Sequence, residues 1–534
     1  MNRPDVIVIG SGIGGLTLAS LLAQLQHKRV LVLERHFQPG GYTHQFSRGK
    51  YHWDVGLHYV GEMQKESNLR QVFDLVTGAQ VEWARLPEPF ERFFYPGFEF
   101  AVQGDPQRYA TDLIARFPAE AKAIRAYFRD IARAARALIC ASLENNMRGW
   151  LRWFFGAGRW WAGRHFSVTT QAYLTTHFRD PTLRALLASQ WGDYGLPPGS
   201  SAFPVHASIA HHYRNGAYYP AGGAGGIGAS VRSIVEGSGG QFMLRREVTE
   251  IIIEEGRAVG VRVRKTGAPG KEPTEEFRAP LIVSDAGAAT TYLRLLPESY
   301  PLMVREPLRR FLERHPSSTT ACLYLGLSAD PRTLGVEGGN IWIYGDQDHD
   351  AIFARRQESL AKGAPEHAYV SFPSLRDPKA TAHTAEILTF ASYDAFAPWR
   401  DQPWLNRDED YRRFKDRIAD GLLRLVESRV PGFSALVAHR ELSTPVTTEH
   451  FTGHHRGGIY GLPACPERLT NEARAWAKVR TPVPGLYLTG VDTMLVAGIV
   501  PGLVSGLLTL NALPGGLSIP AVFREARKRA AEVA

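Results

Sequence analysis

A glycine-rich turn between a short apolar run and a helical pattern constrains this chain more than any other feature. Residues 5–10 form a continuous apolar run, which is typical of a buried parallel strand. Gly10-x-Gly12-x-x-Gly15 follows, and residues 16–26 have the pattern of a helix. The first glycine permits a tight turn, the second lets the backbone approach a pyrophosphate, and the third lets helix and strand pack closely.

An acidic residue completes this unit. A second apolar run, residues 30–33, ends in Glu34, at about the offset from Gly10 expected of an acid that binds a ribose hydroxyl. The N-terminus of the intervening helix offers free N–H groups and a positive dipole end to phosphates. Strand, glycines, helix, strand and acid in this order predict an α/β, Rossmann-type dinucleotide-binding domain. The turn alone does not distinguish FAD from NAD.

Further blocks at both ends of the chain resemble the phytoene desaturase family and, within it, the carotenoid isomerase and retinol saturase branch. These blocks are Glu34-Arg35, Pro39-Gly40-Gly41-Tyr42, Trp53-Asp54-Val55-Gly56-Leu57-His58-Tyr59, the GLYLTGVD run at 485–492 and the GIVPG run at 498–502. The middle of the chain diverges. The resemblance implies FAD, a glutathione-reductase/GDI-like FAD-binding domain, a discontinuous α+β substrate domain and a membrane-associating helical region.

The resemblance also implies which residues bind FAD. Asp492 follows a buried strand and is placed to accept hydrogen bonds from the ribityl chain, and a helix that starts near Pro501 directs its N-terminus at the flavin. A strand around 248–253 passes the adenine. The expected FAD-binding residues are Gly10, Gly12, Ile13, Gly14, Gly15, Glu34, Arg35, Gly40, Gly41, Tyr42, Val248, Asp492, Ile499 and Val500.

The length of 534 residues predicts more than one domain. The aromatic content of 11% suits a large apolar pocket, and the resemblance implies a tunnel for a polyene in the substrate domain. The expected segments are 1–75, 206–290 and 476–515 for the FAD-binding domain, 76–205 and 291–475 for the substrate domain, and 516–534 for a basic tail read as a solvated helix.

A second glycine motif invites a nicotinamide interpretation. Gly223-x-Gly225-x-x-Gly228 fits the same pattern, but the segment before it, residues 215–220, ends in Pro and makes a poor buried strand. Without its strand, the motif more simply opens a helix that returns to the FAD domain. The sequence leaves open whether an NAD(P)H site exists.

Two segments raise the question of a membrane. Residues 493–513 carry no charge and are long enough to span a bilayer, but their glycines, Pro501 and the preceding Asp492 favour a flavin-facing helix. In a helix over 147–166, one face carries Trp and Phe and the other carries Arg, although Phe155 and Arg164 depart from the pattern. The apolar face holds Trp150, Trp153, Phe154, Ala157, Trp160 and Trp161, opposite Arg148, Arg152 and Arg159.

This pattern fits either a helix in a membrane interface or a surface helix packed on its own domain. The resemblance favours a monotopic contact through which a lipid substrate enters. The net charge of +9 suits an anionic surface or simple solubility, and no nucleic-acid motif occurs. Without a visible signal peptide, and with three separated cysteines, we expect a cytoplasmic, peripherally membrane-associated protein without disulfides.

Candidates for catalysis are individually weak, because an isolated histidine is more often structural. Adjacent histidines, as in His211-His212 and His454-His455, diverge and do not make a metal site, so we predict none. Residues that could approach the flavin ring are His58, Tyr59, Glu449, His450, Arg456 and Tyr460.

The leading hypothesis is an FAD-dependent oxidoreductase that desaturates or saturates C=C bonds of a long apolar isoprenoid, such as a carotenoid or retinoid. A redox-neutral cis–trans isomerase and a flavin amine oxidase share the same cofactor blocks. A lipid-binding escort related to Rab GDP-dissociation inhibitors does not need the complete set of glycines and acids found here. Substrate, direction, electron partner and oligomeric state stay open, and the substrate class depends on analogy.

Overall fold

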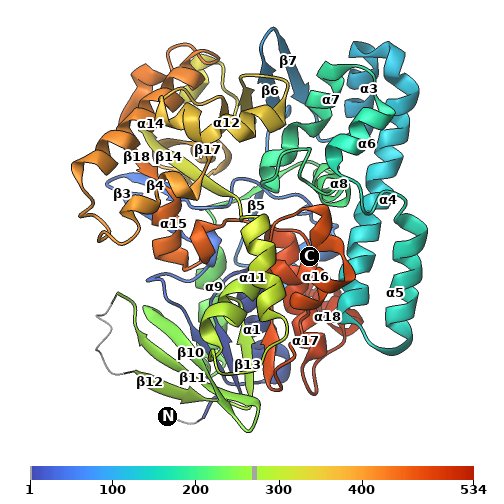
Figure 1. The fold of residues 1–534 in the computed structure, drawn as a ribbon, viewed down its shortest axis with the longest axis vertical. Coiled ribbons are helices and arrows are strands. Elements are labelled where there is room, and N and C mark those ends of the chain that lie inside the picture. The colour runs from blue at the N-terminus through green and yellow to red at the C-terminus, as the bar shows by residue number, and fades with distance from the viewer. Residues whose placement is uncertain (1–2, 268–273, 534) are drawn as a thin grey trace.

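The computed structural model describes residues 3–267 and 274–533, and a five-stranded parallel sheet organises its lower half (Figure 1). The strand order is β19-β13-β1-β2-β9, and every neighbouring pair is parallel. The strands are β1 (Val6–Ile9), β2 (Val30–Leu33), β9 (Gln241–Met243), β13 (Leu281–Ser284) and β19 (Leu486–Leu488). This architecture confirms the predicted α/β, Rossmann-type class.

Three separate stretches of chain supply these strands. All five fall within the segments assigned above to the FAD-binding domain, while the boundaries of that domain stay a prediction. A three-stranded antiparallel sheet lies within the second stretch, between β9 and β13, with β10 (Arg246–Glu254), β11 (Arg257–Lys265) and β12 (Glu275–Arg278) in that order. The strand expected around 248–253 is therefore part of β10, outside the parallel sheet.

Three helices pack closely together beside the parallel sheet. Helix α1 (Ile13–Gln26) begins directly after Gly12, earlier than the predicted residue 16, and packs against α17 (Ile499–Ala512) and α9 (Gly225–Gly237). A Cβ at Gly506 would lie 2.6 Å from the Thr17 side chain. The absence of that side chain lets α17 cross α1 closely.

The C-terminal tail is not a solvated extension. Helix α18 (Ile519–Val533) packs against α2 (Asn68–Thr77), with Val522 and Ala526 buried. Arg529 donates a 2.7 Å hydrogen bond to Gln24 of α1. The interpretation of this tail as a solvated helix is wrong, because its apolar residues recur at helical spacing and pack against α2.

The uncharged stretch at 493–513 is not one long helix. Its first residues belong to a 3₁₀ turn (Val491–Met494). Helix α17 starts only at Ile499 and contains 14 residues, with Pro501 tolerated in its first turn. Among the residues that the structure describes, no helix has the length and apolar character needed to cross a bilayer. The interruption between the 3₁₀ turn and α17 agrees with the prediction that this stretch is not a membrane span.

The upper half contains a seven-stranded sheet with helices α12 (His349–Ala361) and α14 (Glu409–Glu427) packed against it (Figure 1). Its strands, in spatial order, are β18 (Val437–Ser443), β14 (Thr319–Leu327), β17 (His383–Ala391), β16 (His367–Ser371), β15 (Asn340–Tyr344), β6 (Glu91–Tyr95) and β7 (Phe98–Val102). Two further sheets have two antiparallel strands each.

The two-stranded sheets pair β3 (Gln45–Arg48) with β4 (Tyr51–Asp54), and β5 (Trp83–Arg85) with β8 (Tyr218–Pro220). A helical region lies along the right side of Figure 1, where α4 packs against both α5 and α8. Its helices are α3 (Pro106–Arg116), α4 (Ala121–Asn146), α5 (Gly149–Ala162), α6 (Thr170–His177), α7 (Pro181–Ala188) and α8 (Phe203–His212).

Buried neutral histidines should make the fold sensitive to mild acid. His206 is fully buried, and its Nε2 lies 2.9 Å from the Tyr127 hydroxyl. Burial lowers its pKa to about 4. The unfolded chain takes up a proton near pH 6.5 while the folded chain does not, so this contribution to stability is complete above pH 6.5 and is lost as the pH falls towards 4.

We expect the stability difference between wild type and His206→Asn to shrink by at most about 1.4 kcal/mol per pH unit between pH 6.5 and 4. Urea denaturation at pH 7.5, 6 and 5 measures this difference. Comparing two variants cancels the other titrating groups that both share. A difference that does not change with pH would contradict the assignment.

Candidate functional site

A cavity of about 790 Å³ opens at the carboxyl ends of the parallel strands, the place where open α/β sheets bind ligands. It extends from the glycine turn to the seven-stranded sheet. The predicted FAD-binding residues that line it are Gly10, Gly12, Ile13, Gly14, Glu34, Arg35, Gly40, Gly41, Tyr42, Val248, Asp492, Ile499 and Val500. The structure thus gathers residues from both ends of the chain around one space.

The glycines of the turn make room for backbone contacts. A Cβ at Gly14 would lie 2.5 Å from the backbone nitrogen and 2.8 Å from the Cα of Gly490. A Cβ at Gly15 would lie 2.8 Å from the carbonyl oxygen of Gly10, and Gly15 is buried below the turn and does not line the cavity. Gly14 therefore joins the turn to the C-terminal block, and Gly15 brings helix and strand together.

Glu34 lies at the end of β2 and is held there by three donors. Its Oε2 accepts hydrogen bonds from the Ser11 backbone nitrogen (2.9 Å) and hydroxyl (2.7 Å), and its Oε1 accepts one from the His36 nitrogen (2.7 Å). The carboxylate is buried and lines the cavity. These bonds fix its position beside the glycine turn, where the resemblance places a ribose.

Sequence reasoning missed Asp285, which follows β13 directly. Its carboxyl faces the start of α1, with Oδ2 2.6 Å from where a Cβ at Gly12 would lie, and Oδ2 has no hydrogen-bond partner in the described part of the chain. Burial is the main cause that raises its pKa to about 7. The signal was available, because an acid directly after a buried strand is what singled out Glu34.

Asp492 ties three segments together. Its Oδ1 accepts a hydrogen bond from the Leu462 nitrogen (2.7 Å) and its Oδ2 one from the Ala288 nitrogen (2.8 Å). The buried Arg468 donates to its backbone carbonyl at 2.6 Å. Each carboxylate oxygen keeps a further lone pair for a ligand. Asp492 is therefore a structural junction in the wall of the cavity.

An Asp492→Asn variant should lower the free energy of unfolding of the ligand-free protein by about 1–3 kcal/mol. The amide nitrogen would face a backbone N–H donor where the carboxylate oxygen accepted one. Thermal denaturation measures the change, with the exposed Asp401→Asn as control. Equal melting temperatures for the two variants would contradict this role.

The second glycine motif is filled by the chain's own side chains. Ala224 donates a 2.9 Å backbone hydrogen bond to Asp54, and Cβ atoms at Gly223 and Gly225 would collide with Gln45. The preceding strand, β8, pairs with β5 and not with the parallel sheet. The N-terminus of α9 is thus occupied from within, and the assignment of this motif to the FAD-binding domain stays a prediction.

Three of the catalytic candidates reach the cavity. His58, Tyr59 and Tyr460 line it. His58 Nδ1 lies 2.8 Å from Oε2 of the buried Glu386, and the Tyr460 hydroxyl donates to the carbonyl of Gly192 at 2.8 Å. The structure therefore brings together side chains from the block at 53–59 and from the segment before the last cofactor block.

The remaining candidates lie outside this cavity. Glu449 pairs with Arg400 at 3.0 Å and accepts a hydrogen bond from Tyr393, while Arg456 pairs with Asp394 at 2.5 Å. All lie close to Tyr460 in sequence. Helix α15 (Pro445–Thr452) and the turn after it direct the side chains of Glu449 and Arg456 away from the main cavity. Their closeness to Tyr460 in sequence did not show this.

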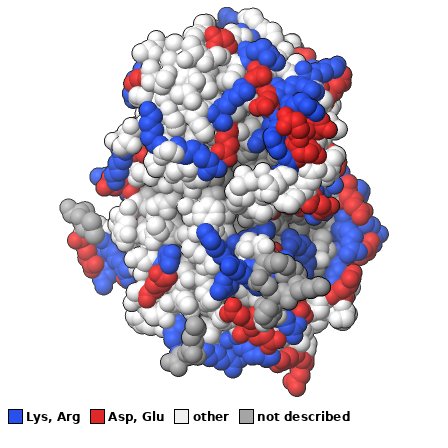
Figure 2. Space-filling view, turned by 90° about the vertical axis from the view of Figure 1, so that its left-hand side faces the viewer, with Lys and Arg blue, Asp and Glu red and all other residues white. Residues whose placement is uncertain are grey.

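A second hollow of about 800 Å³ lies next to the first and is basic. Figure 2, viewed from the left of Figure 1, shows Lys and Arg side chains on both sides of a hollow between the upper and lower halves. His450 lies here and stacks on Trp404 with ring centroids 5.6 Å apart. The arginines that line it are Arg35, Arg294, Arg400 and Arg407.

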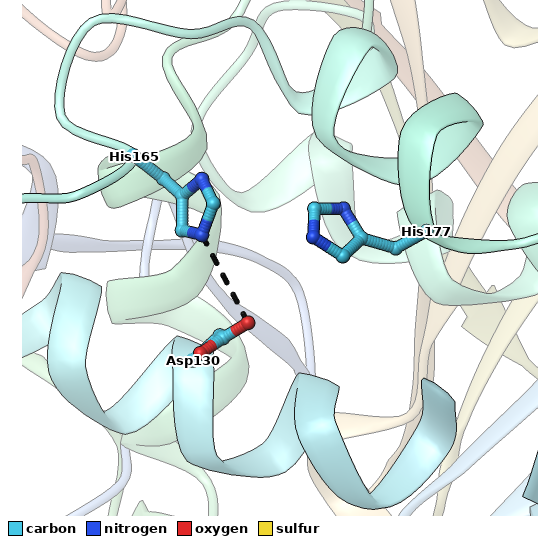
Figure 3. Close-up of side chains that lie close together, drawn as sticks. All are labelled: Asp130, His165 and His177. Carbon is cyan, nitrogen blue, oxygen red and sulfur yellow. Dashed lines mark ion pairs between the residues drawn. The ribbon is translucent and has the colours of Figure 1, made fainter. Parts of the chain in front are cut away.

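Outside both cavities, Asp130 of α4, His165 and His177 point towards one another (Figure 3). They form one of two groups of possible metal ligands among the described residues, the other being His315, Cys465 and Glu467. Asp130 already accepts a 2.8 Å hydrogen bond from the Tyr173 hydroxyl, and His177 Nδ1 lies 2.8 Å from the Tyr173 carbonyl. Neither group contains the adjacent histidine pairs.

The far walls of the main cavity are aromatic. Tyr59 and Tyr213 stack with ring centroids 4.6 Å apart, and Tyr369 lies 4.5 Å from Trp342. All four residues line the cavity. An apolar, aromatic space that is continuous with a dinucleotide-type turn suits a flat, extended apolar molecule placed against a redox cofactor.

Comparison with known proteins agrees with this geometry. A family model described as an NAD(P)-binding Rossmann-like domain matches residues 8–76. All-trans-retinol 13,14-reductase from Danio rerio is 32% identical over 541 residues, covering 95% of this chain and 85% of the relative. Prolycopene isomerase from Arabidopsis thaliana is 23% identical, covering 96% and 83%. Cyclohexylamine oxidase from Brevibacterium oxydans shares the fold with a TM-score of 0.59 at 15% identity, covering 99% of each chain.

Proposed function

Since this chain belongs to the family of the all-trans-retinol 13,14-reductases, we propose that it is an FAD-dependent oxidoreductase that saturates a C=C bond of a long apolar polyene, a retinoid or carotenoid. The observation that carries the proposal is the single cavity that joins the glycine turn to aromatic walls. The 32% identity to a reductase favours saturation over desaturation.

The residues of the cavity fit FAD. The turn has no room for Cβ atoms at Gly14 and Gly15, and the unpaired Oδ2 of Asp285 faces the start of α1. Gly12 and Gly14 would hold the diphosphate, Glu34 the ribose, and Asp492 the ribityl chain. When bound, the flavin supplies a hydride donor and acceptor at N5.

Spectroscopy of the purified protein tests the proposal. We expect a flavin absorption spectrum, and we expect a retinoid or carotenoid to reoxidise flavin that has first been reduced with dithionite. Mass spectrometry should find a product two hydrogens heavier than the substrate. A colourless protein that cannot be reconstituted with FAD, or reduced flavin that no polyene in the panel reoxidises, would contradict the proposal.

A cis–trans isomerase is the second candidate, because a prolycopene isomerase is also related at 23% identity. An isomerase needs no net electron transfer. In the same experiment it would return a product of unchanged mass and leave the flavin reduced. The mass of the product therefore decides between the two activities.

We further propose that α5 rests on a membrane surface, where the substrate enters. Trp153 and Trp160 are 82% and 81% exposed, and Trp150, Phe154 and Trp161 are also exposed. The opposite face packs on α4, where Arg159 forms a 2.6 Å ion pair with Glu144. The prediction that Arg159 belongs to a solvated basic face is therefore wrong, because Arg159 pairs with Glu144 of α4. The exposed Trp and Phe side chains of α5 do not pack against another part of the described chain.

A further inference from the structure

Three polar side chains meet in the wall of the main cavity and share protons. The hydroxyl of Tyr59 lies 2.7 Å from Oε1 of Glu91 and 2.7 Å from Oδ2 of Asp193. A phenol hydroxyl carries one proton and can donate to one carboxylate at a time. The second short contact therefore requires a proton on one of the two carboxyl groups, which then donates to the phenol oxygen.

The other contacts of the two acids identify which one holds that proton. Glu91 is fully buried and also accepts hydrogen bonds from Trp342 Nε1 (3.0 Å) and Gln190 Nε2 (2.8 Å). Burial raises the pKa of Glu91 to about 7, but its three donors stabilise the ionised form, and Asp193 has fewer donors to do so. Asp193 has Tyr59 as its hydrogen-bond partner among the described residues, and burial together with the nearby Glu91 raises its pKa well above the usual range. Asp193 is the neutral acid.

The neutral acid is the one that faces the cavity. Asp193 ends a 3₁₀ turn (Ser189–Asp193) and lines the cavity, whereas Glu91 lies behind it in the seven-stranded sheet. The carbonyl of Gly192, next to Asp193, accepts a hydrogen bond from Tyr460. Leu462, two residues after Tyr460, donates a backbone hydrogen bond to Asp492. A short segment therefore connects Asp193 to the C-terminal cofactor block.

We propose that Asp193 is the proton donor for saturation of the polyene, with Tyr59 and Glu91 as positioning residues; this inference rests on the proposed function. The reaction breaks the π bond of the substrate. One carbon takes a hydride, which brings two electrons from the reduced flavin, and the neighbouring carbon takes the proton of the Asp193 carboxyl. Two C–H bonds form, flavin is oxidised, and Asp193 becomes a carboxylate that is reprotonated from water.

The surroundings explain why an acid is needed at this point. An apolar, aromatic cavity supplies few protons from solvent, so a carboxyl that stays protonated at neutral pH serves as the local source. The ionised Glu91 behind Tyr59 disfavours a second negative charge on Asp193 and so keeps the proton in place. After transfer, the Tyr59 hydroxyl can turn its proton to the new carboxylate.

The first experiment reads the proton directly in the ligand-free protein. The infrared difference spectrum, wild type minus Asp193→Asn, should contain a carboxylic-acid C=O band at pH 7, which separates Asp193 from other buried acids such as Asp285. The matched control, Asp350→Asn, replaces a half-buried aspartate that accepts hydrogen bonds from the Gly199 nitrogen outside the cavity and should leave the band unchanged. A difference spectrum without this band overturns the proposal, whatever the activity of the enzyme.

The second experiment measures a single turnover. Flavin reduced with dithionite is mixed with the polyene that wild type accepts best, and Asp193→Asn should reoxidise it at least 100-fold more slowly, the range for loss of a general acid. Its flavin spectrum and substrate affinity should stay close to wild type. A rate within threefold of wild type would overturn the role of Asp193 even if the infrared band is lost.

Glu91→Gln provides a second variant that does not depend on Asp193→Asn folding. Removing the negative charge should lower the pKa of Asp193, so the single-turnover rate should begin to fall at a lower pH than in wild type, by at least one unit. An unchanged pH profile would count against the coupling. Failure of the proposed function looks different: no polyene reoxidises wild-type flavin, while the infrared band and its loss in Asp193→Asn persist.

Discussion

A Gly14→Ala protein should purify with at least tenfold less bound flavin than wild type, which corresponds to a loss of about 1.4 kcal/mol or more in binding. The added methyl group would lie 2.5 Å from the Gly490 nitrogen, where neither backbone can yield without moving a strand end. Separating the two segments opens the turn that is expected to hold the diphosphate. Flavin absorbance per protein measures the loss.

Gly226→Ala is the matched control for this substitution. Gly226 also lies in the first turn of a helix that follows a glycine motif, but it is exposed and a Cβ there would have no atom within 4 Å. We expect full flavin content and equal or slightly higher stability, because alanine favours helix over glycine by up to about 1 kcal/mol. Equal flavin content in the two variants would show that the Gly14–Gly490 contact does not organise the site.

Removing the tryptophans of α5 should abolish binding to lipid vesicles. If half of each ring is buried in lipid, four rings contribute several kcal/mol, so the quadruple change to Gln should weaken partitioning at least ~100-fold. Its melting temperature should not change, because these rings are exposed in the folded chain. Vesicle flotation measures the effect on Trp150, Trp153, Trp160 and Trp161 together.

The control for this experiment replaces exposed apolar residues elsewhere. Met303 and Leu405 are 94% and 73% exposed and lie outside α5, so changing both to Gln should leave flotation unaltered. Arg152→Gln should reduce binding to anionic vesicles and leave binding to neutral ones unchanged, because its charge attracts headgroups. If the quadruple variant floats like wild type, α5 is not the contact surface.

The two halves of the candidate site differ in how far the sequence predicts them. The turn at Gly10, the acid Glu34 and the strands that flank them were predicted closely, because the whole unit is contiguous and each residue has a conformational reason that local sequence shows. Asp285 carries the same local signal as Glu34 and could have been found. Asp492 lines the cavity and its hydrogen bonds to Leu462 and Ala288 give it a structural task, while its binding of the ribityl chain stays a prediction.

Residues that depend on distant partners were harder to predict. Glu449 and Arg456 lie close to Tyr460 in sequence, yet α15, which contains Glu449, and the turn after it, which contains Arg456, direct these side chains away from the main cavity. The tail after residue 515 was interpreted as a solvated basic helix, because its sequence does not show that α2 packs against its apolar residues. In both cases a helix direction or a packing partner decided the outcome.

The glycine turn with its strands and acid was determined by the sequence alone, since strand, turn and helix preferences act over a few tens of adjacent residues. Only the tertiary structure decided that the side chains of Tyr59, Glu91 and Asp193 meet, because they come from a loop, a strand and a 3₁₀ turn with no common spacing. It likewise decided that the tryptophans of α5 face outwards. Local patterns specify conformation, whereas shared protons and exposed faces depend on which segments pack together.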